Sequence, residues 1–304
     1  MNDKLTHTMS KQDTQLINVF NYNPNNMIFA EPVQGSIPDS KPAINFKRIN
    51  IYSRNPDGST GELVIPTSRI FSFGVTENKS QETGNVNGWT FPLCLWSRDG
   101  PTEEEKAWTD TFNAIVEQCT EHILNTKEEL DKWDLDRNDL KKFNPLYWRR
   151  EKKMVNGKPV FAVVDGVGPT LYSKLIYSKK SDKFLTRFYD SDGSTIDPIE
   201  MLGKYCYTRS VVKIESIFIG TKISLQVKLY ESDIEFINTG MKRLINRPQS
   251  NPNVTTEHPP VLQRNSNGPL DDDDSIGDGS LVEDEDEIQI EKPPAKRRIV
   301  RKAK

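Results

Sequence analysis

The chain has 304 residues, with 41 lysines and arginines against 44 acids and a formal net charge of −3. No apolar run approaches the roughly 20 residues that span a bilayer, and the N-terminus lacks the apolar stretch of a signal peptide. Cys94, Cys119 and Cys206 form no CxxC pair, so we expect reduced, buried thiols in place of a disulfide framework. These features predict a soluble protein that is neither secreted nor bound to a membrane.

The small net charge hides a strong segregation of charge. The segment from Asp271 to Glu291 holds eleven acids and no base, and removing them from a net −3 leaves +8. Residues 141–189 carry twelve lysines and arginines against three acids, a net of +9 in 49 residues. A basic patch and an acidic segment in one chain indicate a polyanionic ligand and a competitor for it within the same chain.

Composition also divides the chain into three parts. Phe236 is the last aromatic residue, and the 68 residues after it cannot bury enough apolar surface to offset their ordering entropy. We therefore expect a disordered tail over residues 247–304 and one folded domain over residues 42–246. Residues 1–41 are expected to form a flexible arm, in which residues 17–20 and 27–29 dock as short extended pieces.

Four strands are predicted in the first half of the domain. They cover residues 44–52, which end at the turn Asn55-Pro-Asp-Gly58, and then residues 63–65, 69–75 and 89–96. Alternation places Phe71, Phe73 and Val75 on one face of the third strand. Pro92 cannot donate a ladder hydrogen bond, so we expect the fourth strand to lie at an edge or to carry a bulge.

One helix follows these strands. Thr102 and Glu105 have the spacing of a capping box directly after Gly100-Pro101. The apolar residues behind them recur at helical spacing: Trp108, Phe112, Ile115, Val116, Cys119 and Ile123. The sequence therefore predicts a helix that packs on a sheet.

A polar link over residues 128–142 leads to a second group of strands. They are predicted at residues 147–150, 160–164, 170–178, 183–189, 207–219 and 222–230, and Gly220 supplies the turn of the last hairpin. Many short strands with one capped helix favour a mainly β fold. We expect an elaborated OB-fold-like antiparallel barrel with one packed α-helix and a disordered C-terminal tail.

Aromatic and basic residues interleave in the second group of strands. The candidate binding residues are Tyr147, Trp148, Arg149, Arg150, Lys152, Lys153, Tyr172, Lys174, Lys179, Lys180, Lys183, Arg187 and Tyr189. Single strands are bound by grooves whose cations follow the phosphates while aromatic faces stack on bases. Alternation groups Tyr172 with Lys174, and groups Lys183 with Arg187 and Tyr189, so two neighbouring strands would present one surface. The alternative is ordinary solvated lysines beside core aromatics.

Trp148 is the residue most expected to stack, because a large aromatic beside two arginines suits both parts of a nucleotide. The alternative is that Trp148 is a tryptophan at the rim of the core.

Signals of catalysis are weak. His7, His122 and His258 are scattered, and no phosphate-binding GxxxxGK motif occurs. Residues 190–194 resemble a calcium loop without its remaining ligands, so a hairpin turn is favoured. We expect no enzyme activity, no cofactor and no metal.

The chain ends in a basic run from Lys296 to Lys304, after Pro293-Pro294. Such a run is typical of a nuclear-localisation signal or of an arm that contacts nucleic acid. Both interpretations stay open at this point.

Three segments carry a resemblance to a known family: Phe91-Pro-Leu-Cys-Leu-Trp96, residues 168–177 and residues 209–228. They resemble the single-stranded DNA-binding proteins of nucleocytoplasmic large DNA viruses, which are similar to the phage replication type with an OB-fold and an acidic C-terminal tail. The resemblance implies a protein that coats single strands and contacts polymerase, helicase or primase through its tail. In the phage type the acids end the chain, whereas here a basic run follows Glu291.

The expected function is therefore sequence-tolerant binding of single-stranded DNA during viral replication, recombination or repair. The expected location is the infected cell, in the nucleus or in a cytoplasmic viral factory, with packaging in the virion left open. A duplex-binding or virion structural protein is the alternative, because a basic patch suffices for it without stacking. A nuclease on the same fold is disfavoured, because no acidic or metal-ligand cluster lies within the domain.

Overall fold

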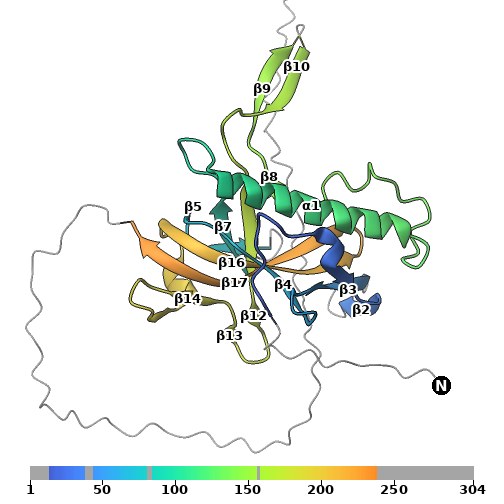
Figure 1. The fold of residues 1–304 in the computed structure, drawn as a ribbon, viewed down its shortest axis with the longest axis horizontal. Helices are drawn as coiled ribbons and strands as arrows, with labels where there is room; N and C mark the ends of the chain where they lie inside the picture. Colours follow the sequence, from blue (N-terminus) through green and yellow to red (C-terminus); the bar gives the residue numbers. More distant parts are fainter. Residues whose placement is uncertain (1–13, 38–43, 81–83, 156–157, 238–304) are drawn as a thin grey trace, which may run out of the picture.

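The computed structural model describes residues 14–37, 44–80, 84–155 and 158–237, and these are mainly β-strands (Figure 1). The strands before the helix are β1 Met27–Phe29, β2 Val33–Ile37, β3 Ile44–Arg54, β4 Thr60–Pro66, β5 Ile70–Ser72, β6 Thr76–Lys79 and β7 Val86–Cys94. The strands after it are β8 Leu146–Tyr147, β9 Arg150–Val155, β10 Lys158–Val163, β11 Thr170–Leu175, β12 Tyr177–Ser178, β13 Lys183–Phe184, β14 Arg187–Tyr189, β15 Thr195–Ile196, β16 Cys206–Ile219 and β17 Ile223–Phe236. The helix is α1 Glu103–Asn125, and two 3₁₀ turns cover Pro24–Asn26 and Pro198–Met201.

Five of these strands close a barrel. Strand β5 pairs with β7, β7 with β11, β11 with β17, β17 with β16, and β16 returns to β5. If these five strands are numbered 1 to 5 in chain order, as β5, β7, β11, β16 and β17, their order around the barrel is 1-2-3-5-4. This is the order of strands in an OB-fold. The predicted OB-fold-like barrel is confirmed. The pairing of β11 with β17 is parallel, however, so the barrel is not wholly antiparallel.

The long hairpin of β16 and β17 lies at the centre of the sheet. One edge of β16 pairs with β5, β4 and β3 in succession, and its other edge pairs with β17 along almost its whole length. Strands β3 and β4 also pair with each other, so β16 belongs to a second, smaller ring of strands beside the barrel. These additional strands make the OB-fold an elaborated one.

The core lies inside these rings and beneath α1. Phe91, Leu93 and Leu171 are fully buried on inward-facing positions of β7 and β11. All six apolar residues of the predicted helical stripe are buried, which confirms the packed helix. The predicted capping box is also present, because Thr102 accepts a hydrogen bond from the backbone of Glu105 while the Glu105 carboxylate accepts one from the backbone of Thr102.

The Glu105 carboxylate offers a test of how α1 is anchored. It is buried and accepts hydrogen bonds from Ser97 N (3.1 Å), Ser97 Oγ (2.6 Å) and Thr102 N (2.8 Å). Glu105→Ala leaves these donors unpaired, so we expect a loss of about 1–3 kcal/mol in the free energy of unfolding, measured by urea denaturation. Glu104→Ala, at an exposed position of the same turn, is the matched control. Equal losses in the two variants would contradict this account.

The fold begins earlier than the expected boundary at residue 42. Strand β1 pairs with β3, Leu16 bridges to Val64, and Val19 and Met27 join the core. The expected docking of residues 27–29 is therefore confirmed. Polar composition hid this segment, since only a few of its side chains are apolar enough to anchor it. The predicted tail, residues 247–304, lies outside the described residues.

Two details of the first strands differ from expectation. The strand predicted at residues 69–75 ends at Ser72, because Gly74 has φ +83, and Phe73 is 42% exposed while Val75 is buried. Phe73 and Val75 are thus not on one face. Pro92 lies in a central strand, but at the point where the neighbour of β7 changes from β6, which pairs with residues 86–90, to β5, which pairs with residues 93–94.

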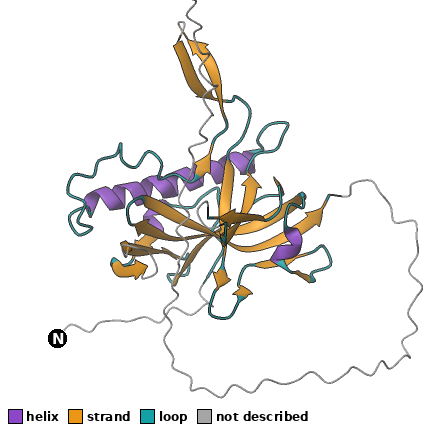
Figure 2. Cartoon of the chain, turned by 180° about the vertical axis from the view of Figure 1, so that it is seen from behind, coloured by secondary structure: helices purple, strands orange, loops and turns teal. Residues whose placement is uncertain are grey.

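The second group of strands is more divided than predicted. Strand β9 was not foreseen, and it forms with β10 a two-stranded ribbon that projects from the barrel (Figures 1 and 2). The predicted strand at residues 170–178 breaks into β11 and β12, and that at residues 183–189 breaks into β13 and β14. In the described part of the chain, no helix has both the length and the apolar character needed to cross a membrane.

Candidate nucleic-acid interface

The outer face of β7, β11 and β8 holds the best-formed part of the predicted surface. Along β11, Leu171, Ser173 and Leu175 are buried, whereas Tyr172 and Lys174 face outward, as alternation predicted. Tyr172 is 50% exposed and Tyr147 on β8 is 46% exposed, and their ring centroids lie 6.3 Å apart, edge to face. Two exposed rings, one on β8 and one on the third barrel strand, thus lie on the face of the sheet that also carries Lys174.

Lys174 is held in place by its neighbours on β17. Its Nζ donates to Gln226 Oε1 (3.1 Å), and Gln226 Nε2 in turn donates to Ser224 Oγ (2.8 Å). This bridge to the Gln226 amide positions the ammonium. The arrangement offers a cation at a fixed place next to Tyr172.

A row of directly paired residues continues this surface across the barrel. Tyr147 pairs with Thr170, Thr170 with Cys94, Cys94 with Phe71, and Phe71 with Tyr207. All five side chains face outward, opposite to buried neighbours on their strands. Adjacent strands lie about 4.8 Å apart, so the row spans roughly 19 Å, enough for several nucleotides.

Four aromatic residues gather at the far end of this row, and we call them the Phe71 cluster: Phe71, Phe73, Tyr205 and Tyr207. The Phe71 ring lies 5.1 Å from that of Phe73, 5.8 Å from Tyr205 and 6.0 Å from Tyr207, each edge to face. Phe73 and Tyr205 are 42% and 59% exposed. Sequence reasoning missed this cluster, because its two halves come from residues 71–73 at the end of β5 and from residues 205–207 at the start of β16, and only the pairing of these strands brings them together.

Arg69 adds a cation to the Phe71 cluster. Its guanidinium lies 3.8 Å from the centroid of the Tyr207 ring and donates to both carboxylate oxygens of Glu235 (2.7 and 2.8 Å). The hydrogen bond to Glu235 raises the pKa of Arg69 and, in return, lowers that of Glu235. This ion pair fixes the arginine over one ring and leaves Phe73 and Tyr205 as the open rings.

Trp148 is not among the exposed rings. It is half-buried, packs against the core, and meets Trp96 edge to face with ring centroids 5.4 Å apart. The structure thus supports the alternative interpretation, a tryptophan at the rim of the core. Its neighbours Arg149 and Arg150 are exposed.

The ribbon of β9 and β10 carries the next predicted cations. Arg150 and Lys152 occupy alternate positions of β9 and share one face, whereas Lys153 lies on the other. Lys153 Nζ lies 3.2 Å from Glu151 and 3.4 Å from Asp165, and Glu151 is the larger cause of the raised pKa of Lys153. The structure therefore separates Lys153 from Arg150 and Lys152.

Lys179, Lys180 and Lys183 lie at the other end of β11. They are exposed on the hairpin of β12 and β13, which follows β11 directly (Figure 1). Tyr177 on this hairpin donates to Asp182, which raises the pKa of Tyr177, and its ring packs against Trp89 and Phe184. The predicted cations thus extend along β11 from the ribbon at one end to this hairpin at the other.

Arg187 and Tyr189 are not part of that surface. Both lie on β14, and β17 separates β14 from β11. The two predicted strands therefore pair only where β12 meets β13, and the expected place of Arg187 and Tyr189 beside Tyr172 and Lys174 is wrong. Arg187 pairs in register with Glu231, and Tyr189 with Asp233. A hydrogen bond with Tyr189 raises the pKa of Arg187. These two residues therefore lie in more acidic surroundings than Tyr172 and Lys174.

Other chemistry has little support in the described residues. No group of three His, Cys, Asp or Glu side chains there could hold a metal ion. Asp190 accepts hydrogen bonds from Asp192 N and Ser194 N, which makes residues 190–194 the favoured hairpin turn. Cys119 and Cys206 are buried, as predicted, and burial raises the pKa of each thiol to about 12.

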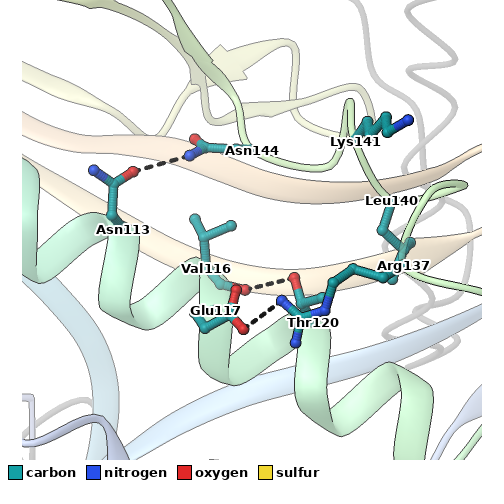
Figure 3. Close-up of a pocket in the computed structure, with 8 residues that line it drawn as sticks. All are labelled: Asn113, Val116, Glu117, Thr120, Arg137, Leu140, Lys141 and Asn144. Carbon is teal, nitrogen blue, oxygen red and sulfur yellow. Dashed lines mark hydrogen bonds and ion pairs between the residues drawn. The ribbon is translucent and has the colours of Figure 1, made fainter.

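A hollow of about 340 Å³ lies between α1 and the loop that follows it (Figure 3). Arg137 donates to Glu117 (2.6 Å) and to Glu121, and Asn144 donates to Asn113 (2.9 Å). These contacts join the loop to the helix and pair the polar groups with one another. The contacts around the hollow therefore hold the loop against α1, and the geometry of the hollow indicates no ligand.

Comparisons with known proteins relate the chain to viral proteins. A family model described as "Protein of unknown function (DUF2738)" matches residues 21–274. Over 171 residues the chain is 25% identical to "Uncharacterized protein 007R" of Invertebrate iridescent virus 3, covering 55% of this chain and 34% of that protein. Over 171 residues it is 29% identical to "Early 31 kDa protein" of Frog virus 3 (isolate Goorha), covering 56% of this chain and 62% of that protein. The match spans less than two thirds of either relative, and both relatives come from iridoviruses, in agreement with the expected viral source.

Proposed function

This chain belongs to the DUF2738 family, and we propose that it is a non-enzymatic protein that binds single-stranded DNA on the outer face of β7, β11 and β8. The observation that carries the proposal is the pair of exposed rings, Tyr147 and Tyr172, on the face of β8 and β11 that also carries Lys174. By analogy of fold, the face of the second and third strands is the part of an OB-fold barrel that binds oligonucleotides. The two rings would stack on bases, and the lysine would contact a phosphate.

The exposed rings favour a single strand over a duplex as the ligand. Base-aromatic stacking contributes about 1–3 kcal/mol per base and needs bases that are already unstacked. An intact duplex offers only its phosphates to this surface. Since every base has a π-face, binding by stacking is tolerant of sequence. The row from Tyr147 to the Phe71 cluster provides further rings for the same strand.

The biological role follows from this activity and remains part of the proposal. A protein of this kind would coat single strands during viral DNA replication, recombination or repair in the infected cell. One relative is named an early protein, which suits a role at that stage. The acidic segment would contact polymerase, helicase or primase, as the family resemblance implies.

Competition tests the proposal directly. Single-stranded DNA, duplex DNA and RNA oligonucleotides compete for the protein against one labelled single strand, and we expect single-stranded DNA to compete better than duplex. A duplex that competes equally well would favour the alternative of a duplex-binding or virion structural protein. Equal competition by RNA would add RNA to the ligands of this surface and would leave the proposed binding face unchanged.

The salt dependence of binding gives a second prediction. Arg149→Ala or Lys174→Ala should each reduce the slope of log affinity against log salt by about 0.7 for single strands, since each variant loses one phosphate contact. Lys106→Ala, at an exposed position of α1, is the matched control and should leave the slope unchanged. Slopes that agree among the three variants would argue against this surface.

A further inference from the structure

The ribbon of β9 and β10 is built as an exposed projection. It forms a separate two-stranded sheet, and both views show it standing away from the barrel (Figures 1 and 2). A backbone hydrogen bond from Val164 N to Arg149 O (2.9 Å) closes its base. Met154 is 66% and Phe161 63% exposed, so large apolar side chains face solvent on this element.

The register sorts the ribbon side chains onto two faces. Lys152 pairs directly with Phe161, and Arg150 pairs with Val163, on one face. The intervening pairs, Lys153 with Val160 and Glu151 with Ala162, face the other way. The only aromatic side chain of the two strands therefore shares a face with Arg150 and Lys152.

The two faces also differ in charge. On the second face, Glu151 and Asp165 pair with Lys153 and offset its charge. On the first face, the residues of β9 and β10 include two cations and no acid. We call the residues Arg150, Lys152 and Phe161 the ribbon face. A π-face next to cations suits an unpaired base and its phosphate better than an apolar protein surface.

We propose that the ribbon face is a second binding site for the bases and phosphates of the same single strand, and that it lengthens the site on the barrel. This inference rests on the proposed function. The geometry permits a continuous path, because Arg150 follows Tyr147 by three residues, a span of at most about 11 Å. Phe161 would stack on a base, while Arg150 and Lys152 would contact the phosphates beside it.

Phe161 and Val160 are neighbours on β10 that face opposite ways, so they provide a matched pair of variants. Phe161→Ala changes the proposed face and Val160→Ala changes the opposite face, and both positions are exposed on the same strand. Affinities are measured for oligothymidylates from about 4 to about 16 nucleotides, the range of site sizes on OB-folds. We expect Phe161→Ala to weaken binding about 5- to 150-fold on the longer strands alone, with Phe161→Tyr close to the unaltered protein. Val160→Ala should bind every length normally.

The outcomes separate the inference from the proposed function. If the unaltered protein binds no single strand at any length, both fail. If it binds and Phe161→Ala matches Val160→Ala at every length, only the ribbon inference fails. A weakened self-association of Phe161→Ala in sedimentation, with unchanged DNA affinity, would instead assign the ribbon to contacts between copies of this chain.

Discussion

Tyr147→Ala and Tyr172→Ala should each weaken the binding of single-stranded DNA by about 5- to 150-fold, which corresponds to about 1–3 kcal/mol of lost stacking. Duplex binding should change little, because an intact duplex presents no free base to these rings. Filter binding or fluorescence anisotropy with both ligands measures the difference. The two rings touch each other, so the double variant should lose less than the sum of the single losses.

Two controls sharpen this result. Tyr172→Phe keeps the ring and should bind almost normally. Tyr189→Ala removes a ring from β14, beside Asp233, and should weaken binding less than Tyr172→Ala does. An equal loss in Tyr189→Ala would extend the interface across β17. Unchanged affinity in folded Tyr147→Ala and Tyr172→Ala proteins would exclude this face as the stacking surface.

Deleting the acidic segment from Asp271 to Glu291 should tighten DNA binding. Its eleven carboxylates imitate the charge of a nucleic-acid backbone and compete for the same cations. Exposed ion pairs contribute about 0.2–1 kcal/mol each, so a few such contacts give roughly a tenfold effect at low salt. The gain should fade as the Debye length falls from about 10 Å at 0.1 M to about 3 Å at 1 M. Titrations at two salt concentrations measure it.

A variant with the eleven acids replaced by their amides is the matched control, because it keeps the length of the chain. It should bind as tightly as the deletion. Deleting Lys292 to Lys304 should have the reverse effect, since those seven bases offset part of the acidic charge. Equal affinity with and without the acidic segment at low salt would eliminate self-competition and leave that segment to partner binding or solubility.

Local patterns predicted the parts of this structure that depend on neighbouring residues. The spacing of Thr102 and Glu105 gave the start of α1, and alternation along residues 170–175 gave the outward positions of Tyr172 and Lys174. Both inferences rest on the fixed periods of helices and strands. They hold wherever one element is regular over its own length.

Features set by distant residues could not be predicted in the same way. The position of β17 between β11 and β14 follows from the closing of the barrel, and no pattern within residues 170–189 encodes it. The Phe71 cluster needs β5 to pair with β16, a register that neither segment specifies alone. Trp148 looks like a binding residue beside its arginines, yet it meets Trp96, a contact between segments separated by the whole of α1.

The shared strand β16 has a consequence for how this protein is made. Strands β3, β4 and β5 emerge early from the ribosome, but their common partner ends at Ile219, and β17 ends at Phe236. The barrel therefore cannot close until nearly all of the described residues have been synthesised. Unpaired strand edges are prone to aggregation during such a delay. A nascent chain that stalls before Cys206 would expose three such edges and would depend on chaperones to stay soluble.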